Sequence, residues 1–408
     1  MAKKDNLIVG LDIGTTKVTA VVGEMHHDGV DIIGVGSHPS RGLRKGVIVN
    51  IEATIEAIKR AIEEAELVAN CDILSVYASI SGSHIKGINN HSIVQVKNKL
   101  VTEKDVERVI DGASAVVMPM DRQIIHIVPQ EFIVDEQDGV KEPIGMACMK
   151  FEANVHIVTA AISAVQNIVK CANRCGLNVN DVVLSPLAAA EAVLSSDEKE
   201  LGVVLVDIGG GTTDVIVYLD GSVVHTSVIP VGGHHVTNDI TVGLRTPTGD
   251  AEKIKQKNGC ALSSMVHIDE TIDVPSVGGR KSRVLSRQIL AEIIEPRMEE
   301  IFTLVKEDLA AARLSESISS GVVLTGGGSQ MEGTTELAEQ VFDYPVRRGA
   351  PHGVGGFLDA VKNPSFATGV GLVMYGRQLQ QKTLFRSKDG NVVVKFREKM
   401  KTWFADIF

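Results

Sequence analysis

Short apolar runs alternate with helix-period segments along most of this chain. Leu7–Leu11, Val18–Val22, Val203–Val206 and Val215–Val217 have the length and residue types of buried β-strands. Between them lie longer segments whose apolar residues recur at helical spacing. This alternation favours an α/β fold. At 408 residues the chain is long enough for more than one domain with an ample core.

Two predicted turns between these strands are near copies of each other. The first is Leu11-Asp12-Ile13-Gly14-Thr15-Thr16-Lys17, and the second is Val206-Asp207-Ile208-Gly209-Gly210-Gly211-Thr212-Thr213-Asp214. In each, backbone N–H groups and hydroxyls can face phosphate oxygens while the Asp carboxylate faces a metal ion or its waters. An ordinary hairpin turn would explain one copy. Two copies with Asp at the same offset indicate two similar domains that close on one nucleotide.

A third glycine-rich element lies later in the chain. The apolar run Val322-Val323-Leu324 leads into Thr325-Gly326-Gly327-Gly328-Ser329, and a helix-like stretch follows. Backbone without side chains at a strand-to-helix turn lets a flat ring or a ribose approach closely. Alone, a glycine triplet is a weak signal.

These three elements, in this order, resemble the phosphate-1, phosphate-2 and adenosine motifs of the actin, sugar kinase and chaperone ATPase superfamily. The resemblance covers residues 5–380. It implies two α/β domains built on ribonuclease-H-like sheets, with ATP and Mg²⁺ in the cleft between them and with Asp12 and Asp207 near the metal through water. The residues it assigns to nucleotide binding are Asp12, Gly14, Thr15, Thr16, Lys17, Asp207, Gly209, Gly210, Gly211, Thr212, Thr213, Gly326, Gly327 and Gly328.

Residues 251–255 resemble the helix of this superfamily whose Glu and Lys flank the ribose and adenine. The resemblance adds Glu252 and Lys255 to the nucleotide site. Without it, an exposed helix face with charges three residues apart is an equally good interpretation.

Composition excludes several other classes of site. The formal net charge of −10 and the absence of a basic stripe with interleaved aromatics argue against a nucleic-acid partner. Cys171 and Cys175 lie one helical turn apart without a second pair or a nearby His, so we expect reduced thiols. His26-His27 and His234-His235 are expected to be surface residues. No secretory signal and no run of about 18 apolar residues is present, so we expect a cytoplasmic protein.

The composition changes after Tyr375. The polar segment from Gly376 to Asn391 predicts a mobile linker. Residues 392–408 then predict an amphipathic helix, whose bulky side chains fall within an arc of about 140° flanked by lysines and arginine. A C-terminal helix docked on the protein's own core is the alternative. The polar linker and the single Trp favour an anionic membrane surface, contacted through Phe396, Met400, Trp403, Phe404 and Ile407.

Residues 84–162 predict a compact αβ module between the phosphate turns. Strands are expected at Ile93–Val96, Ile124–Val128, Glu131–Val134 and Asn154–Thr159, with a helix from Thr102 to Val117. The sequences around residues 128–132, 143–146 and 155–159 resemble the inserted subdomain of the FtsA family of bacterial cell-division proteins.

That second resemblance carries expectations about function. It implies an actin-like filament protein on the inner face of the cytoplasmic membrane at the division septum. Its expected partners are further copies of itself, the C-terminal peptide of the tubulin-like protein FtsZ, and later division proteins that bind the 84–162 module.

One departure from the superfamily bears on catalysis. Related ATPases carry a Glu-Pro pair whose Glu orients the attacking water, whereas this chain has Ser185-Pro186. Loss of such a carboxylate costs orders of magnitude in rate. We therefore expect at most slow ATP hydrolysis, with nucleotide acting as an assembly ligand.

The expected domain order follows from these assignments. The first actin-like domain comprises residues 1–83, 163–195 and 361–380, and the second comprises 196–226 and 308–360. Residues 227–307 form a small subdomain of the second, and residues 381–391 form the linker.

The small subdomain is the expected docking place of the acidic FtsZ peptide. We expect the contact near Arg283 and Arg287, on a helical pattern from Val284 to Leu314 that also carries Arg297. A solvated helix face is the plainer interpretation. Two other functions stay open: a pilus-assembly or shape-determining actin-like scaffold, and a sugar or acetate kinase of the same superfamily.

Overall fold

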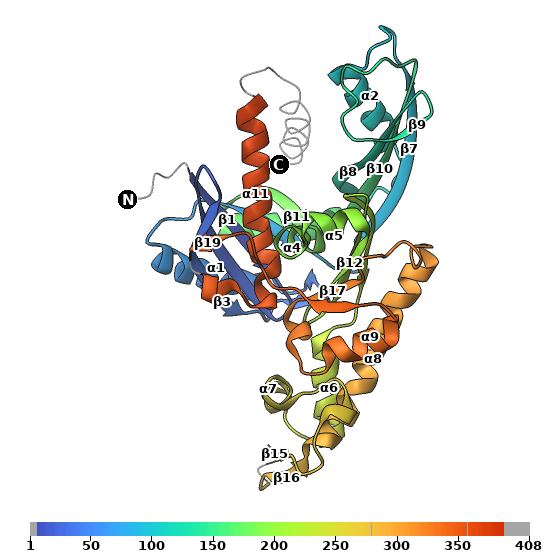
Figure 1. Ribbon diagram of the computed structural model, residues 1–408. Helices are drawn as coiled ribbons and strands as arrows, with labels where there is room; N and C mark the ends of the chain where they lie inside the picture. The colour runs from blue at the N-terminus through green and yellow to red at the C-terminus, as the bar shows by residue number, and fades with distance from the viewer. Residues whose placement is uncertain (1–5, 279, 357, 387–408) are drawn as a thin grey trace.

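The computed structural model describes residues 6–278, 280–356 and 358–386. Two sheets form its centre, and smaller parts extend above and below them (Figure 1). The first sheet has six strands in the order β11-β6-β1-β2-β3-β19. Their bounds are β1 Leu7–Ile13, β2 Lys17–Met25, β3 Val30–Pro39, β6 Ser75–Ile80, β11 Asn178–Leu184 and β19 Gly355–Gly356. The predicted α/β class is confirmed.

Helices cover both faces of the first sheet because its strands are apolar on both sides. On one face, alternate residues such as Leu11 and Val22 pack with α1 (Ile51–Ala69) and α3 (Ile162–Arg174). On the other, Ile8 and Val21 pack with α4 (Ser185–Val193) and α11 (Ala367–Arg386). Helix α1 begins where Asn50 Oδ1 accepts a hydrogen bond from Ala53 N at 3.1 Å, the usual N-cap contact.

The second sheet repeats this plan with five strands in the order β14-β13-β12-β17-β18. Their bounds are β12 Val203–Ile208, β13 Thr213–Leu219, β14 Ser222–Ile229, β17 Val322–Thr325 and β18 Val346–Arg348. One face packs on α6 (Gly233–Leu244), α8 (Arg287–Ala311) and α9 (Thr334–Phe342). Residues of the other face join the same buried cluster as α4 and α11. The two sheets therefore share one apolar core.

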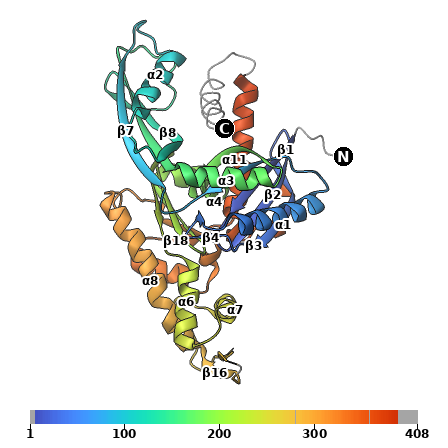
Figure 2. The same ribbon diagram turned by 180° about the vertical axis from the view of Figure 1, so that it is seen from behind.

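The inserted module is a four-stranded sheet, β7-β10-β8-β9, with one helix against it (Figures 1 and 2). Its elements are β7 Lys86–Gln95, α2 Glu103–Ser114, β8 Arg122–Val134, β9 Gln137–Val140 and β10 Lys150–Ala161. The two strands expected on either side of Pro129 are a single strand, because the pairing with β10 shifts register beside Pro129. A bulge tolerates a residue that has no N–H to donate.

This module also contacts the second domain. Gln130 Nε2 donates to Val223 O and Asn89 Nδ2 donates to Val224 O, each at 2.9 Å, on the edge strand β14. The insert is therefore fixed to both halves of the molecule.

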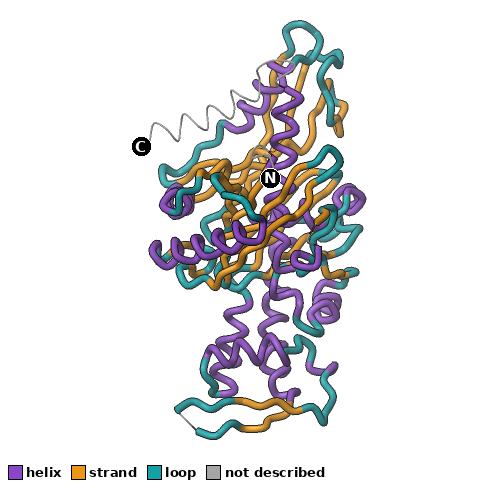
Figure 3. The backbone as a smooth tube through the Cα atoms, turned by 90° about the vertical axis from the view of Figure 1, so that its left-hand side faces the viewer, coloured by secondary structure: helices purple, strands orange, loops and turns teal. Residues whose placement is uncertain are grey.

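The lower subdomain is mainly helical (Figure 3). It contains α6, α7 (Thr248–Asn258), a two-stranded sheet and the first turns of α8. The sheet pairs β15 (Thr271–Val274) with β16 (Arg283–Ser286). The helix expected from Val284 thus begins only at Arg287, since the preceding residues pair as a strand.

Short elements complete the two domains. The hairpin β4 (Leu43–Arg44) and β5 (Val47–Ile48) precedes α1 in the first domain, and α5 (Ser196–Leu201) precedes β12 in the second. The chain returns to the first sheet at β19, before the expected boundary at 361, and α10 (Leu358–Val361) follows.

The expected linker is wrong over its first part. Helix α11 continues to Arg386, so residues 376–386 are helical. Gln, Leu, Lys and Arg dominate this segment and are good helix formers, and a helix already begun at Ala367 is extended at little cost. The amphipathic segment 392–408 lies outside the described residues. None of the described helices has the length and apolar character needed to cross a membrane.

Candidate nucleotide cleft

The two predicted turns are confirmed as hairpins with the same closure. Gly14 N donates to Lys17 O at 3.0 Å between β1 and β2, and Gly209 N donates to Thr212 O at 2.9 Å between β12 and β13. In each hairpin the Asp is paired within the ladder, one residue before the end of the first strand. The repeated sequence therefore gives a repeated backbone geometry, once in each domain.

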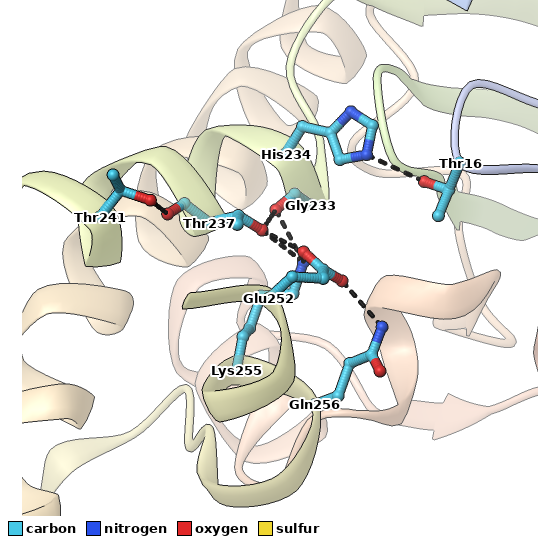
Figure 4. Close-up of polar contacts among 8 residues, drawn as sticks. All are labelled: Thr16, Gly233, His234, Thr237, Thr241, Glu252, Lys255 and Gln256. Carbon is cyan, nitrogen blue, oxygen red and sulfur yellow. Dashed lines mark hydrogen bonds and ion pairs between the residues drawn. The ribbon is translucent and has the colours of Figure 1, made fainter. Parts of the chain in front are cut away.

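The turns face each other across a cleft between the domains. A Cβ on Gly210 would lie 1.9 Å from Thr16 Oγ1, and one on Gly211 would lie 2.7 Å from Thr15 Oγ1. Only glycine allows this approach. His234, at the start of α6, also crosses the cleft, with Nε2 3.2 Å from Thr16 Oγ1 (Figure 4). His234 is exposed, as expected, but it contributes to the contact between the domains.

Three carboxylates lie in the cleft, and each accepts a hydrogen bond from one hydroxyl. Asp207 and Asp214 are buried, and Asp12 is half-buried. Ser79 Oγ donates to Asp12 at 2.8 Å and Ser81 Oγ donates to Asp214 at 2.6 Å. Thr368 Oγ1, on α11, donates to Asp207 at 3.2 Å. The hydroxyls on Asp207 and Asp214 come from the opposite domain.

The carboxylates have too little positive charge around them. Burial raises the pKa of Asp207 to about 7, and the nearby Asp12 adds to the shift. Burial and then the charge of Asp207 hold the pKa of Asp214 well above its usual range. Burial also raises the pKa of Asp12, against the hydrogen bond from Ser79. A cation between the domains would favour the ionised forms.

Lys17 does not supply that charge freely. Its Nζ donates to Ser365 Oγ at 3.1 Å and lies 3.6 Å from the centre of the Phe366 ring. Burial lowers the pKa of Lys17, and the attraction of Asp12 partly offsets this. The ammonium is therefore held by the short helix η4 (Pro364–Phe366), between the first turn and α11.

The glycine triplet packs against the second hairpin and opens toward the cleft. Gly326 has φ 80°, and a Cβ there would lie 2.2 Å from Asp207 Oδ1. A Cβ on Gly328 would lie 2.4 Å from Ile208 Cγ2, whereas one on Gly327 would meet only Ser365, at 3.9 Å. Two of the three glycines thus serve packing, and Gly327 leaves space.

Glu252 and Lys255 point toward the start of α6 (Figure 4). Their ion pair is 2.8 Å long, and Lys255 Nζ also donates to Gly233 O at 2.9 Å and Thr237 Oγ1 at 2.8 Å. Burial lowers the pKa of Lys255, against the pull of Glu252. The exposed-face interpretation of this helix is wrong for these two residues, because both line the cleft.

The cleft has a volume of about 640 Å³ and is lined from both domains. It brings together all but two of the residues expected from the sequence. The two exceptions are Gly211 and Thr213. Gly211 packs against Thr15, and Thr213 is buried and donates its hydroxyl hydrogen to Val231 O at 2.9 Å. No cluster of three His, Cys, Asp or Glu side chains suited to hold a metal occurs in the described part of the chain.

Several polar residues in the cleft or beside it were not identified from the sequence. These are Ser79, Ser81, Asp214, His234, Ser365 and Thr368. Asp214 was visible at the end of the second motif, where its place after the turn predicts the same edge of the sheet. The isolated hydroxyls had no local signal. Ser185 lines the cleft and donates to Ile80 O at 3.1 Å.

The arginines expected to receive an acidic peptide are engaged within the protein. Arg287 pairs with Glu270 at 2.7 Å and with Glu332. Arg297 pairs with Asp239 at 2.7 Å, and Arg283 donates to Leu244 O. A contact in the Arg283–Arg287 region stays a prediction, in which an incoming acidic peptide would compete with Glu270 and Glu332 for Arg287.

The fold is that of the actin-like proteins. The structure superimposes on the PilM–PilN type IV pilus biogenesis complex with a TM-score of 0.65 at 18% identity, covering 90% of this chain and 98% of that one. MreB5 of Spiroplasma citri bound to ADP gives a TM-score of 0.52 at 17% identity, covering 95% and 100%. For the MamK double helical filament the TM-score is 0.52 at 14% identity, covering 91% and 98%.

Sequence comparison defines the family within this class. The model described as cell division protein FtsA matches residues 204–371, and the SHS2 domain inserted in FtsA matches residues 82–159. The chain is 52% identical over 386 residues to the cell division protein FtsA of Pseudomonas aeruginosa, covering 94% of this chain and 93% of that protein. It is 45% identical over 380 residues to FtsA of Escherichia coli K12, covering 91% and 90%. The chain belongs to the FtsA family of cell division proteins.

The pKa of Asp207 predicts a pH dependence of stability. The pKa of the Asp207 carboxyl is higher in the folded protein than its ordinary value of 3.8, so the folded protein loses stability as pH rises from about 4 to about 7. Asp207→Asn removes this loss. Across that range the free energy of unfolding of the variant should therefore rise relative to that of wild type, by at most roughly 4 kcal/mol.

The measurement is denaturant unfolding in chelator-treated buffer between pH 4 and pH 8. Exposed Asp138→Asn is the control and should follow wild type at every pH. A difference between Asp207→Asn and wild type that stays constant with pH would contradict the assigned charge environment.

Proposed function

We propose that the cleft binds ATP with Mg²⁺ and that nucleotide binding controls assembly of this cell division protein. The observation that carries this proposal is the pair of matching turns, which face each other beside the carboxylates of Asp12, Asp207 and Asp214. Backbone N–H groups and hydroxyls of both turns would hold phosphate oxygens. Asp12 and Asp207 would hold the waters of Mg²⁺, whose charge offsets that of the phosphates.

The residues fit such a ligand. The raised pKa values of Asp12, Asp207 and Asp214 mark a region where a cation would stabilise the ionised forms. Gly327 leaves space beside the second turn, and Glu252 and Lys255 offer polar groups on the other wall. The fold is shared with a solved MreB5 structure that contains ADP.

Slow turnover follows from the same site. Ser185 stands where related ATPases have a Glu, and its hydroxyl donates a hydrogen bond to Ile80 O. ATP is thus proposed as a ligand that fixes the relative position of the domains.

On the membrane side, we propose that filaments of this protein tether FtsZ to the inner face of the cytoplasmic membrane at the division septum. Family membership supports a role in division, and the shared fold includes the MamK filament. The aromatic and basic residues of segment 392–408 support attachment to anionic lipid. The subdomain of residues 227–307 is proposed to bind the acidic FtsZ peptide. The insert is proposed to bind later division proteins.

The ATP site predicts a severe effect of one steric substitution. Gly210→Val places side-chain atoms where Thr16 Oγ1 lies, so the turns must separate and ATP binding should be lost. Asp207→Ala should weaken the binding of Mg-ATP by one to a few kcal/mol, roughly the contribution of a charged hydrogen bond. Titration calorimetry measures both affinities.

The matched control is Gly249→Ala. Gly249 lies in the first turn of α7, and nothing is found within 4 Å of a Cβ added there. Its affinity for ATP should equal that of wild type. If Gly210→Val also bound Mg-ATP with wild-type affinity, the cleft would not be the nucleotide site.

The tail predicts a loss of membrane recruitment. Trp403→Glu replaces a large apolar side chain, worth about 1.5–3 kcal/mol when fully buried, by a charge that anionic lipid repels. One tail binds reversibly, and many tails on one filament give stable attachment. With ATP, wild type should therefore sediment with anionic vesicles and carry FtsZ with it.

The variant should leave both proteins in the supernatant and keep its ATP affinity. Neutral vesicles and added salt should weaken recruitment of wild type. Sedimentation of FtsZ to the same extent with Trp403→Glu would contradict the proposal that this tail tethers FtsZ to the membrane. Loss of ATP binding by this variant would instead support a tail docked on the protein's own core.

A further inference from the structure

The hairpin formed by β4 and β5 lies where the two phosphate turns meet. Its turn consists of Lys45 and Gly46. Gly46 N donates to Thr15 Oγ1 of the first turn at 3.1 Å. A Cβ on Gly211 of the second turn would lie 3.1 Å from the Cα of Lys45. The backbone of this hairpin turn thus lies against one residue from each domain's phosphate turn.

The turn is held in place from a third side. A Cβ on Gly46 would lie 3.0 Å from the Cα of Gly82, the residue after Ser81. Ser81 in turn donates its hydroxyl hydrogen bond to Asp214. The backbone at Lys45 is therefore positioned by contacts within the protein.

Lys45 occupies an unfavourable backbone region for a residue with a side chain. Its φ is 51°, and that of Gly46 is 76°. Two-residue hairpin turns with both φ values positive favour Asn, Asp and Gly at the first position. A lysine held in this region beside a ligand site suggests that its side chain is used.

The charges around the cleft point the same way. Lys17 is occupied by Ser365 and Phe366, and Lys255 by Glu252 and the α6 backbone. The floor carries three carboxylates. Lys45, in contrast, is exposed and has no hydrogen bond or ion pair to any residue that the structure describes. A triphosphate entering between the turns brings further negative charge to this point.

We propose that Lys45 binds the terminal phosphate of a nucleoside triphosphate and makes the cleft distinguish ATP from ADP. The ammonium, at the end of a flexible four-carbon stem, donates to the outermost phosphate, which a diphosphate lacks. The proposal rests on the proposed ATP site. It adds a residue outside the three glycine-rich motifs and gives the hairpin a part in sensing the nucleotide state.

The test compares the affinities of variants for Mg-AMPPNP and Mg-ADP by calorimetry on the full chain. Lys45→Gly keeps the turn, because Gly-Gly suits this geometry, and removes the ammonium. It should weaken the affinity for Mg-AMPPNP roughly tenfold or more and change the affinity for Mg-ADP by less than about twofold. The reason is that a charged hydrogen bond is lost only with the triphosphate. Lys45→Arg should retain most of the preference.

Two control variants separate charge from backbone effects. Arg44→Ala removes the neighbouring exposed cation of the same hairpin. Lys99→Gly replaces a lysine of the insert that also has a positive φ, 58°, and so relieves the same kind of backbone strain elsewhere. Both should leave the two affinities unchanged. Lys45→Gln repeats the loss of charge without the flexibility of glycine, so a poorly folded glycine variant does not leave the question open.

The outcomes are distinguishable from failure of the ATP site. Equal weakening of AMPPNP and ADP by both neutral variants, or no weakening of either, would overturn the role of Lys45 and leave the ATP site intact. Wild type that bound neither nucleotide would overturn both proposals.

Discussion

The packing of two helices between two sheets determines the rest of this structure. Helices α4 and α11 lie in one buried cluster with residues from both sheets. Their contact is so close that a Cβ on Gly371 would lie 1.8 Å from Ala188 O. Interiors packed at this density transmit small shifts. Because both hairpins extend from strands fixed to this shared core, their turns meet in one place, and Thr368 on α11 reaches Asp207 directly.

Electrostatics makes the resulting cleft a candidate ligand site, because its carboxylates have little compensating positive charge. Each carboxylate at its floor has one hydroxyl donor and little cationic compensation, and Lys17 and Lys255 are held by their own partners. A Mg-nucleotide complex would bring a cation that favours the ionised forms of these carboxylates where the domains meet. Binding at such a site would couple to the position of the domains, and through β14 to the insert, whose Gln130 and Asn89 donate to the backbone of β14.

The sequence predicted what local pattern controls. The duplicated turns, the α/β class and the inserted module were predictable because strand-Asp-turn-strand repeats are read within a few residues, and family comparison adds the division role. It could not predict Ser79 or Thr368, whose partners are far along the chain, nor that Thr213 turns its hydroxyl to Val231. The linker was predicted wrongly over its first part because its polar composition was taken for irregular structure, whereas helix propensity decides that segment.

The central claim is that the two turns close on one Mg-nucleotide. Hydrogen–deuterium exchange of the wild-type chain, with and without Mg-ATP, tests it most directly because it reads each turn separately. The account predicts slower exchange on ligand addition in residues 13–17 and 208–213 together, and in 326–328, with unchanged exchange in the outer strands β15 and β16. Protection confined to one domain, or none in either turn at saturating Mg-ATP, would contradict it.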